Sequence, residues 1–109
     1  MATDSQKQER RGAEVYGGKV HSASGATNGW KNDVHTPDLS IEFKTTRNKS
    51  YSLKLSDLIT ATGHALLGDR DMLFGIDFVT TGRTYRYVVM EEDQYFALRE
   101  LAYGSQAPG

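Results

Sequence analysis

The segment from Asp33 to Lys44 most constrains the fold of this chain, because it carries charge where a short β-hairpin normally buries apolar residues. Apolar strand formers alternate along its second half: Leu39, Ile41 and Phe43. Residues 36–39 read Thr-Pro-Asp-Leu, a pattern that is typical of a turn. The segment is therefore predicted to form two short antiparallel strands joined by a tight turn.

Counting across this turn brings charged side chains together. If the chain reverses between Pro37 and Asp38, Asp33 lies opposite Glu42. Lys44 is two residues beyond Glu42, so both share one face of the second strand. Two carboxylates this close repel each other unless a cation lies between them or one is protonated. A divalent cation relieves the repulsion, and carboxylate oxygens favour Mg²⁺ or Mn²⁺.

A different interpretation is that these charges mark the edge of a sheet, where they deter aggregation. Against it, Ile41 and Phe43 alternate with Glu42 and Lys44 on a strand that we expect to be central. A central strand has little reason to carry such charges unless a site uses them. We therefore favour a functional site.

Length and composition bound the class of protein. At 109 residues the chain is expected to form a single domain, with a short disordered N-terminus and a frayed tail over about residues 104–109. The formal net charge is −1, so a nucleic-acid-binding surface would have to be local. The chain has no cysteine, which excludes disulfides and fits a reducing cytoplasm. It also has no apolar run of membrane-spanning length and no signal-peptide pattern, so we expect a soluble cytoplasmic protein.

Periodicity and punctuation predict the element order αβββαββα, an α/β fold with a mixed central sheet flanked by helices. The expected elements are a helix over 4–16, strands over 19–22, 32–36 and 39–46, a helix over 55–67, strands over 72–79 and 84–90, and a helix over 91–101. Asp4 or Ser5 is the expected N-cap of the first helix. Glu9, Ala13 and Tyr16 share one face of that helix, and we expect this face to pack inward. In the last helix, three residues are expected to point inward: Tyr95, Leu98 and Leu101.

At the hairpin, Asp33 followed by Glu42-Phe43-Lys44 resembles the PD-(D/E)xK nuclease motif of the restriction-endonuclease-like fold. Further segments extend the resemblance in chain order: Lys7-Gln-Glu9-Arg-Arg, Gly17-Gly-Lys19, Ser24-Gly-Ala26, Lys31-Asn-Asp33-Val, Ile41-Glu-Phe-Lys-Thr-Thr46 and Ser50-Tyr-Ser-Leu53. Together they are similar to phage and archaeal-type Holliday junction resolvases. The resemblance covers residues 7 to about 58, and the remainder shares only its strand-strand-helix ending. A single D…ExK triplet occurs often by chance, whereas ordered matches with sensible spacing are more specific.

The resemblance implies an active site of four side chains: Glu9, Asp33, Glu42 and Lys44. Asp33 and Glu42 would bind Mg²⁺, with Mn²⁺ as a substitute, and the backbone carbonyl of Phe43 would be a further ligand. Glu9 would complete the acidic cluster from the first helix, directly or indirectly. Lys44 would orient the attacking water or stabilise charge on the scissile phosphate. Phosphodiester hydrolysis needs such groups, because a metal lowers the pKa of bound water and a cation stabilises the transition state.

The literal Pro-Asp dipeptide is Pro37-Asp38, which departs from the family pattern. Asp38 precedes Glu42 by only four residues, so no antiparallel return fits between them. Asp33 is therefore the expected ligand, and Asp38 remains the alternative if the turn lies elsewhere.

Candidate DNA contacts flank this centre at several points of the chain: Arg10, Arg11, Lys19, Ser24, Gly25, Trp30, Lys31, Arg47 and Lys49. The basic side chains would contact phosphates, which position DNA without reading its sequence, or else they are solvated surface charge. Ser24 and Gly25 lie in a loop of small residues that suits close approach of a phosphate backbone. Trp30 would stack on a base or cover the core.

The three histidines, His21, His35 and His64, lack metal-ligand spacing, and each is expected to pack or to face solvent. His35 lies two residues from Asp33 and is a candidate to point toward the same face. No Gly-rich phosphate loop followed by Lys-Ser/Thr is present, so the sequence does not support a nucleotide cofactor.

The resemblance implies an Mg²⁺-dependent endonuclease that nicks four-way DNA junctions symmetrically as a homodimer, in the host cytoplasm if it is phage-encoded. A two-fold dimer matches the two symmetry-related cleavage points of such a junction. Residues of the 53–67 helix or of the C-terminal strand-helix unit are candidates for the dimer interface. Two alternatives stay open: a repair nuclease for flaps or other branched DNA, and a nucleic-acid-binding module without catalysis.

Overall fold

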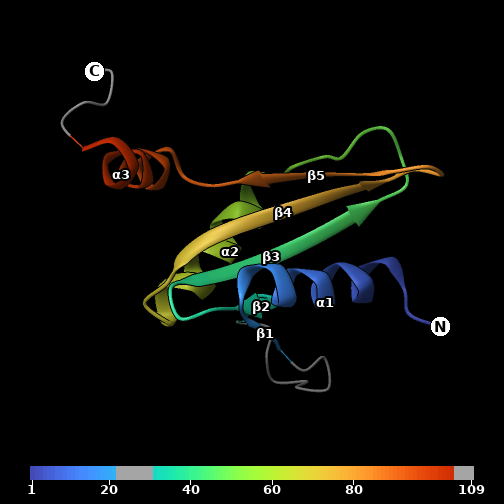
Figure 1. Cartoon of the computed structure of the whole chain (residues 1–109), viewed down its shortest axis with the longest axis horizontal. Helices are drawn as coiled ribbons and strands as arrows, with labels where there is room; N and C mark the ends of the chain where they lie inside the picture. The colour runs from blue at the N-terminus through green and yellow to red at the C-terminus, as the bar shows by residue number, and fades with distance from the viewer. Residues whose placement is uncertain (22–30, 105–109) are drawn as a thin grey trace.

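The sheet of this protein has five strands in the order β1-β2-β3-β4-β5, in a computed structural model that describes residues 1–21 and 31–104 (Figure 1). The elements follow the chain in the order α1 (Asp4–Tyr16), β1 (Lys19–Val20), β2 (Val34–His35), β3 (Leu39–Thr46), α2 (Leu55–Leu67), β4 (Asp71–Val79), β5 (Thr84–Val89) and α3 (Glu92–Tyr103). This is the predicted order αβββαββα, and the fold is α/β as predicted. The first two strands are shorter than the sequence pattern suggested.

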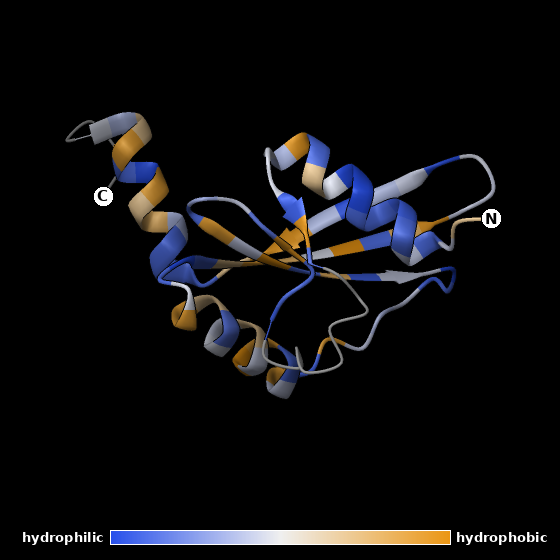
Figure 2. Cartoon of the chain, turned by 90° about the horizontal axis from the view of Figure 1, so that it is seen from below, coloured by the Kyte–Doolittle hydropathy of each residue, from blue (hydrophilic) through white to orange (hydrophobic). Residues whose placement is uncertain are grey.

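The centre of the sheet is a parallel pair, β3 and β4, whereas all other neighbouring strands are antiparallel. The α2 helix makes the crossover that a parallel connection requires. Figure 2 shows α1 and α2 on opposite faces of the sheet, with α3 projecting beyond one end. The β3 strand is central, as expected, but β2 pairs with it only at Ser40 and Ile41, and the part that carries Glu42 and Lys44 pairs with β4 alone.

Each face of the sheet has its own core. Under α2 the buried residues are Ala61, Ala65, Met72, Phe74 and Ile76. Under α1 they are Val34, Ile41 and Leu73, with Ala13 and Tyr16 packed against them. The predicted inward face of α1 is therefore confirmed for its two apolar members. Burial of apolar surface on both faces holds β3 and β4 rigidly between the helices.

The α1 helix begins with a capping box at Thr3, so the predicted N-cap, Asp4 or Ser5, lies one or two residues too late. The N-cap is Thr3, whose side chain accepts a hydrogen bond from the backbone N–H of Gln6 at 3.1 Å. The Gln6 side chain in return accepts a hydrogen bond from the Thr3 N–H at 2.9 Å. This reciprocal pair satisfies two amides that would otherwise lack partners, which is why Thr3 is preferred over Asp4 and Ser5.

A close approach of α1 to the sheet is made possible by two glycines around Phe43. A Cβ at Gly12 of α1 would collide with the Phe43 ring, and one at Gly75 of β4 would lie 2.7 Å from it. The ring thus fills the space that both missing side chains leave. This packing fixes the middle of β3, where the candidate site residues lie.

The α3 helix differs from the other two helices in that none of its residues is buried. The prediction that Tyr95, Leu98 and Leu101 point inward is wrong, because their side chains are between 46% and 84% exposed. None of the helices in residues 1–21 and 31–104 is both long and apolar enough to cross a bilayer.

Candidate active site

The register of the β2–β3 hairpin is the one that counting across the turn predicts. Val34 pairs with Ile41, and His35 pairs with Ser40. The same register continued by one residue brings Asp33 level with Glu42. The reversal therefore falls between residues 37 and 38, as expected.

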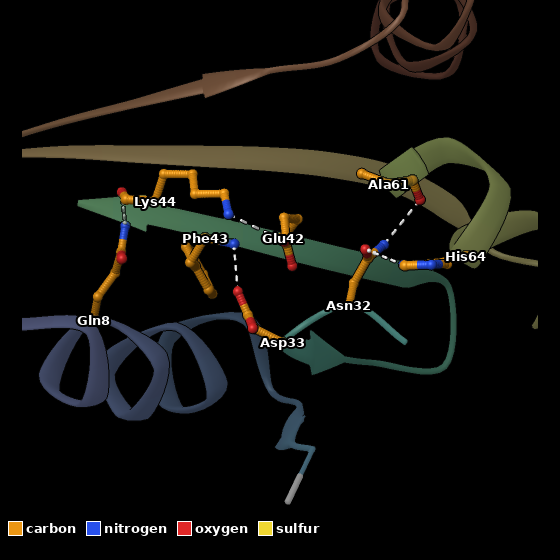
Figure 3. Close-up of polar contacts among 8 residues, drawn as sticks. All are labelled: Gln8, Asn32, Asp33, Glu42, Phe43, Lys44, Ala61 and His64. Carbon is orange, nitrogen blue, oxygen red and sulfur yellow. Dashed lines mark hydrogen bonds and ion pairs between the residues drawn. The ribbon is translucent and has the colours of Figure 1, made fainter. Parts of the chain in front are cut away.

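The Asp33 carboxylate is anchored to the central strand. Its Oδ2 accepts a hydrogen bond from the backbone N–H of Phe43 at 2.8 Å (Figure 3). The Asp33 carbonyl accepts a second bond from the His21 N–H, also at 2.8 Å. Because both bonds involve backbone amides, the position of Asp33 follows directly from the strand geometry.

Glu42 is the most strongly perturbed acid of this group. Burial, the charge of Asp33 and a hydrogen-bonding contact with its carboxyl together raise the pKa of Glu42 to about 7, although Lys44 acts in the opposite direction. The Lys44 Nζ lies 3.5 Å from Glu42 Oε2 (Figure 3). The two carboxyls therefore hold a proton between them near neutral pH, or need a cation in its place.

Glu9 joins this cluster electrostatically from α1. Burial raises the pKa of Glu9, and the negative charge of Asp33 raises it as well. Three acids from three segments of the chain, Glu9, Asp33 and Glu42, are thus coupled through Asp33. The sequence analysis placed the same three acids together.

The carboxylates of this cluster can be compared with the ligands that the predicted divalent metal needs. In the part of the chain that the structure describes, no group of three or more His, Asp or Glu side chains is arranged to hold a metal ion. Mg²⁺, however, commonly binds through one or two carboxylates and keeps several waters. The Asp33–Glu42 pair meets this lower requirement, and a bound cation would offset the burial and the Asp33 charge that raise the pKa of Glu42.

Two buried amides that sequence reasoning missed support the site from either side. Gln8 Nε2 donates a hydrogen bond to the Lys44 carbonyl at 2.6 Å, which ties α1 to β3. Asn32 Nδ2 donates to Ser40 Oγ and to the Ala61 carbonyl, each at 2.9 Å. Asn32 is 2% exposed, and it fixes the residue directly before Asp33 (Figure 3).

Tyr51 is a further residue near the charged cluster. Burial raises its pKa, and the charges of Lys44 and Glu42 act on it in opposite directions. Tyr51 also packs against the core under α2. In the sequence, Tyr51 belongs to the segment Ser50-Tyr-Ser-Leu53, which is part of the resemblance to the resolvases.

The three histidines lie closer together than their spacing suggests. His35 Nδ1 and His21 Nε2 are 2.8 Å apart, and their rings lie 4.2 Å apart between centroids. His64 Nδ1 lies 3.1 Å from the Asn32 side-chain oxygen. All three line a small pocket of about 90 Å³ with Lys31 and Arg70. Burial lowers the pKa of both His21 and His35. The short distance between their ring nitrogens shows that His35 pairs with His21.

Asp38 is occupied in the turn itself. Its Oδ1 accepts a hydrogen bond from the Thr36 hydroxyl at 2.8 Å, and its carbonyl accepts one from the Asp71 N–H at 3.0 Å. The Asp38 side chain is exposed. Geometry therefore favours Asp33 over Asp38 as the partner of Glu42.

The candidate basic contacts are spread over several parts of the surface. Arg47 is held by Asp4 through two hydrogen bonds of 2.7 and 3.0 Å. Lys49 lines a groove with Tyr85 and Tyr87, whereas Lys31 lines the histidine pocket. The remaining basic candidates are exposed on the α1 side and on β1: Arg10, Arg11 and Lys19. Three candidates lie outside the described residues: Ser24, Gly25 and Trp30.

Comparison with known proteins adds no assignment to this geometry. No protein-family model, no curated protein and no solved structure matches the chain.

Proposed function

We propose that this chain is a metal-dependent DNA endonuclease with a restriction-endonuclease-like fold that nicks four-way junctions. The observation that carries the proposal is the Asp33–Glu42 pair with Lys44 beside it on the central strand. Glu42 lies in a position where burial and Asp33 raise its pKa to about 7. Such perturbed groups cluster at functional sites, because catalysis and metal binding need groups whose pKa values are matched to the task.

The side chains have separate tasks in phosphodiester hydrolysis. Asp33 and Glu42 hold the metal, which when bound polarises the phosphate and lowers the pKa of a bound water. Asp33 keeps its orientation because the Phe43 amide holds one of its oxygens. Lys44 carries the positive charge that stabilises the crowded anion on the phosphate, or it orients the attacking water.

Glu9 and Gln8 act from α1. Glu9 adds negative charge next to Asp33 and would help to hold a metal ion there, directly or through water. Gln8 positions the Lys44 backbone through the 2.6 Å hydrogen bond. The α1 helix therefore orients the charged residues of β3, although it belongs to a distant part of the sequence.

Support for DNA as the substrate comes from the basic residues around the centre and from the motif order. Exposed Arg10, Arg11 and Lys19 offer phosphate contacts that are independent of base sequence. Arg47 is a weaker candidate, since its guanidinium is already paired with Asp4.

The experiment is incubation of the purified protein with a synthetic four-way junction in Mg²⁺, with cleavage mapped on all four strands. Paired nicks at symmetric positions are expected. Equal cleavage of flaps and linear duplex would contradict junction selectivity and favour a general branched-DNA nuclease. Binding without cleavage in both Mg²⁺ and Mn²⁺ would favour a non-catalytic binding module.

A further inference from the structure

The α3 helix exposes an apolar surface that none of the residues 1–21 and 31–104 covers. Its large apolar side chains are all at least 46% exposed: Tyr95, Phe96, Leu98, Leu101 and Tyr103. A helix of 12 residues is marginal in water without tertiary packing. The spacing of Tyr95, Leu98 and Leu101 aligns them along one side of the helix. This side, the α3 stripe, needs a partner surface.

A matching apolar groove lies on the outer side of α2. It has a volume of about 460 Å³, and three large side chains of α2 line it, Leu55, Ile59 and Leu66, each more than 60% exposed. The inner side of α2 is made by Ala61 and Ala65, with Leu58 partly buried against the same core. Leu55, Ile59 and Leu66 remain largely exposed, so the apolar surface of α2 extends beyond what its own sheet covers.

The groove and the α3 stripe have matching lengths but do not meet within one chain. Leu55 to Leu66 spans roughly 17 Å of helix, and the 12 residues of α3 span roughly 18 Å. Only Met90 and Glu91 connect β5 to α3, so the helix leaves the end of the sheet and points away from the body (Figure 2). The groove is lined at this end by Val89, Met90 and Glu91.

We propose that the occupant of the groove is α3 of a second copy of this chain, in a two-fold dimer in which each α3 stripe lies on the α2 groove of the other chain. Each copy carries both halves of the contact, so the two contacts form together and close the assembly. The exposed apolar side chains of α3 and α2 present roughly 1,000 Å², taking about 200 Å² for each large side chain. A standard interface buries about 800 Å² on each partner, and in a two-fold dimer each chain would contribute both of these surfaces.

Cross-linking between two different variants tests this arrangement directly, because the chain has no cysteine of its own. One batch carries Ile59→Cys and the other carries Leu98→Cys, and the mixture is treated with a short bismaleimide. A covalent species with the mass of two chains is expected from the mixture. The matched control replaces Ile59→Cys by Val15→Cys, an exposed apolar position on α1, and is expected to give no such product.

Sedimentation equilibrium without DNA or metal measures the same contact in solution. The wild type is expected to be a dimer, and Leu98→Glu and Ile59→Glu are each expected to raise its Kd at least about 30-fold. Val15→Glu is the control that leaves the dimer intact. Leu98 and Ile59 are both exposed in the single chain, so the far-UV circular dichroism of either glutamate variant should match that of the wild type. The two variants change opposite sides of the same contact, so each is an independent test of it.

Three results would overturn the proposal. The first is a wild type that stays monomeric at 100 µM. The second is a cross-link that forms only within a chain carrying both cysteines, which would show that α3 folds back on its own groove. The third is a dimer that neither glutamate weakens, which would place the interface elsewhere. None of these readouts depends on nuclease activity, so this proposal and the proposed function can fail separately.

Discussion

At the scale of single residues, Glu42 connects the chemistry of the site to the stability of the protein. Its pKa is raised from 4.5 to about 7, so the folded chain binds a proton here more tightly than the unfolded chain does. The stabilisation from this proton is present below pH 4.5 and is lost as the pH rises toward 7. A bound cation would replace it at higher pH.

We therefore expect the free energy of unfolding of the metal-free protein, taken relative to that of Glu42→Gln, to fall between pH 5 and pH 8; the comparison cancels the opposite contribution of His21 and His35, whose pKa values are lowered. The decrease should be on the order of 2 kcal/mol, since one pKa unit corresponds to about 1.4 kcal/mol. Urea denaturation at both pH values measures it, and Glu42→Gln is the control, because the amide does not titrate. Equal slopes for the wild type and Glu42→Gln would show that Glu42 is not the titrating group.

The choice between two aspartates also belongs to this scale. Asp33→Asn keeps the shape of the side chain but removes a charge from the metal pair, so junction cleavage should fall at least about 100-fold, while binding is largely kept. Asp38→Asn should cleave at nearly the wild-type rate, because the Asp38 carboxylate is bonded to Thr36 within the turn. An active Asp33→Asn together with an inactive Asp38→Asn would move the ligand to Asp38.

At the scale of secondary-structure elements, the contact between α1 and β3 decides whether the site is formed. Gly12 lets α1 approach until its backbone meets the Phe43 ring, and Phe43 is the residue whose amide holds Asp33. The buried Gln8 side chain lies on the same side of the helix. A displacement of α1 would therefore move Glu9, Asp33 and Lys44 relative to one another.

Gly12→Ala tests this coupling. An alanine in a helix is normally more stable than a glycine, but here its Cβ collides with Phe43, so we expect a loss of about 1–3 kcal/mol in unfolding free energy. Gly63→Ala in α2 is the matched control, because its Cβ has no neighbour within 4 Å, and it should stabilise by about 0.5–1 kcal/mol. Cleavage should fall only in Gly12→Ala. A stabilised Gly12→Ala would contradict the tight contact.

At the scale of the whole molecule, metal binding and folding are linked through the site. A ligand that binds only the folded state stabilises it, by about 2.7 kcal/mol when its concentration is 100 times Kd. At pH 8 Glu42 is ionised, so the repulsion between the two carboxylates is largest. The free energy that a bound cation contributes is therefore also largest at this pH. The folded chain should therefore gain stability from Mg²⁺ at this pH.

Thermal unfolding at pH 8 measures this gain as a rise in Tm of several degrees on addition of Mg²⁺. Removal of the metal with a chelator should reverse it. Glu42→Gln should lose most of the rise because it removes one of the two carboxylates. An equal rise in the wild type and in Glu42→Gln would place the bound Mg²⁺ away from this pair.

The sequence alone determined the element order and the pairing of Asp33 with Glu42. Both follow from short-range rules: periodicity identifies helices and strands, and counting across a tight turn sets a register. The distance from Asp33 to Glu42 along the chain is short, so the prediction needed no knowledge of how the sheet packs. The charged central strand was predictable for the same reason.

Only the tertiary structure decided which residues support the site and where the large apolar side chains lie. Gln8 and Asn32 find partners 36 and 29 positions away, and no local pattern marks such a bond. The apolar periodicity of α2 and α3 indicates a helix side that requires burial, but it does not identify the surface that packs against it. In α2 the alanines pack on the sheet, and in α3 no other described part of the chain covers Tyr95, Leu98 and Leu101. The direction in which a helix leaves the sheet is set by long-range packing.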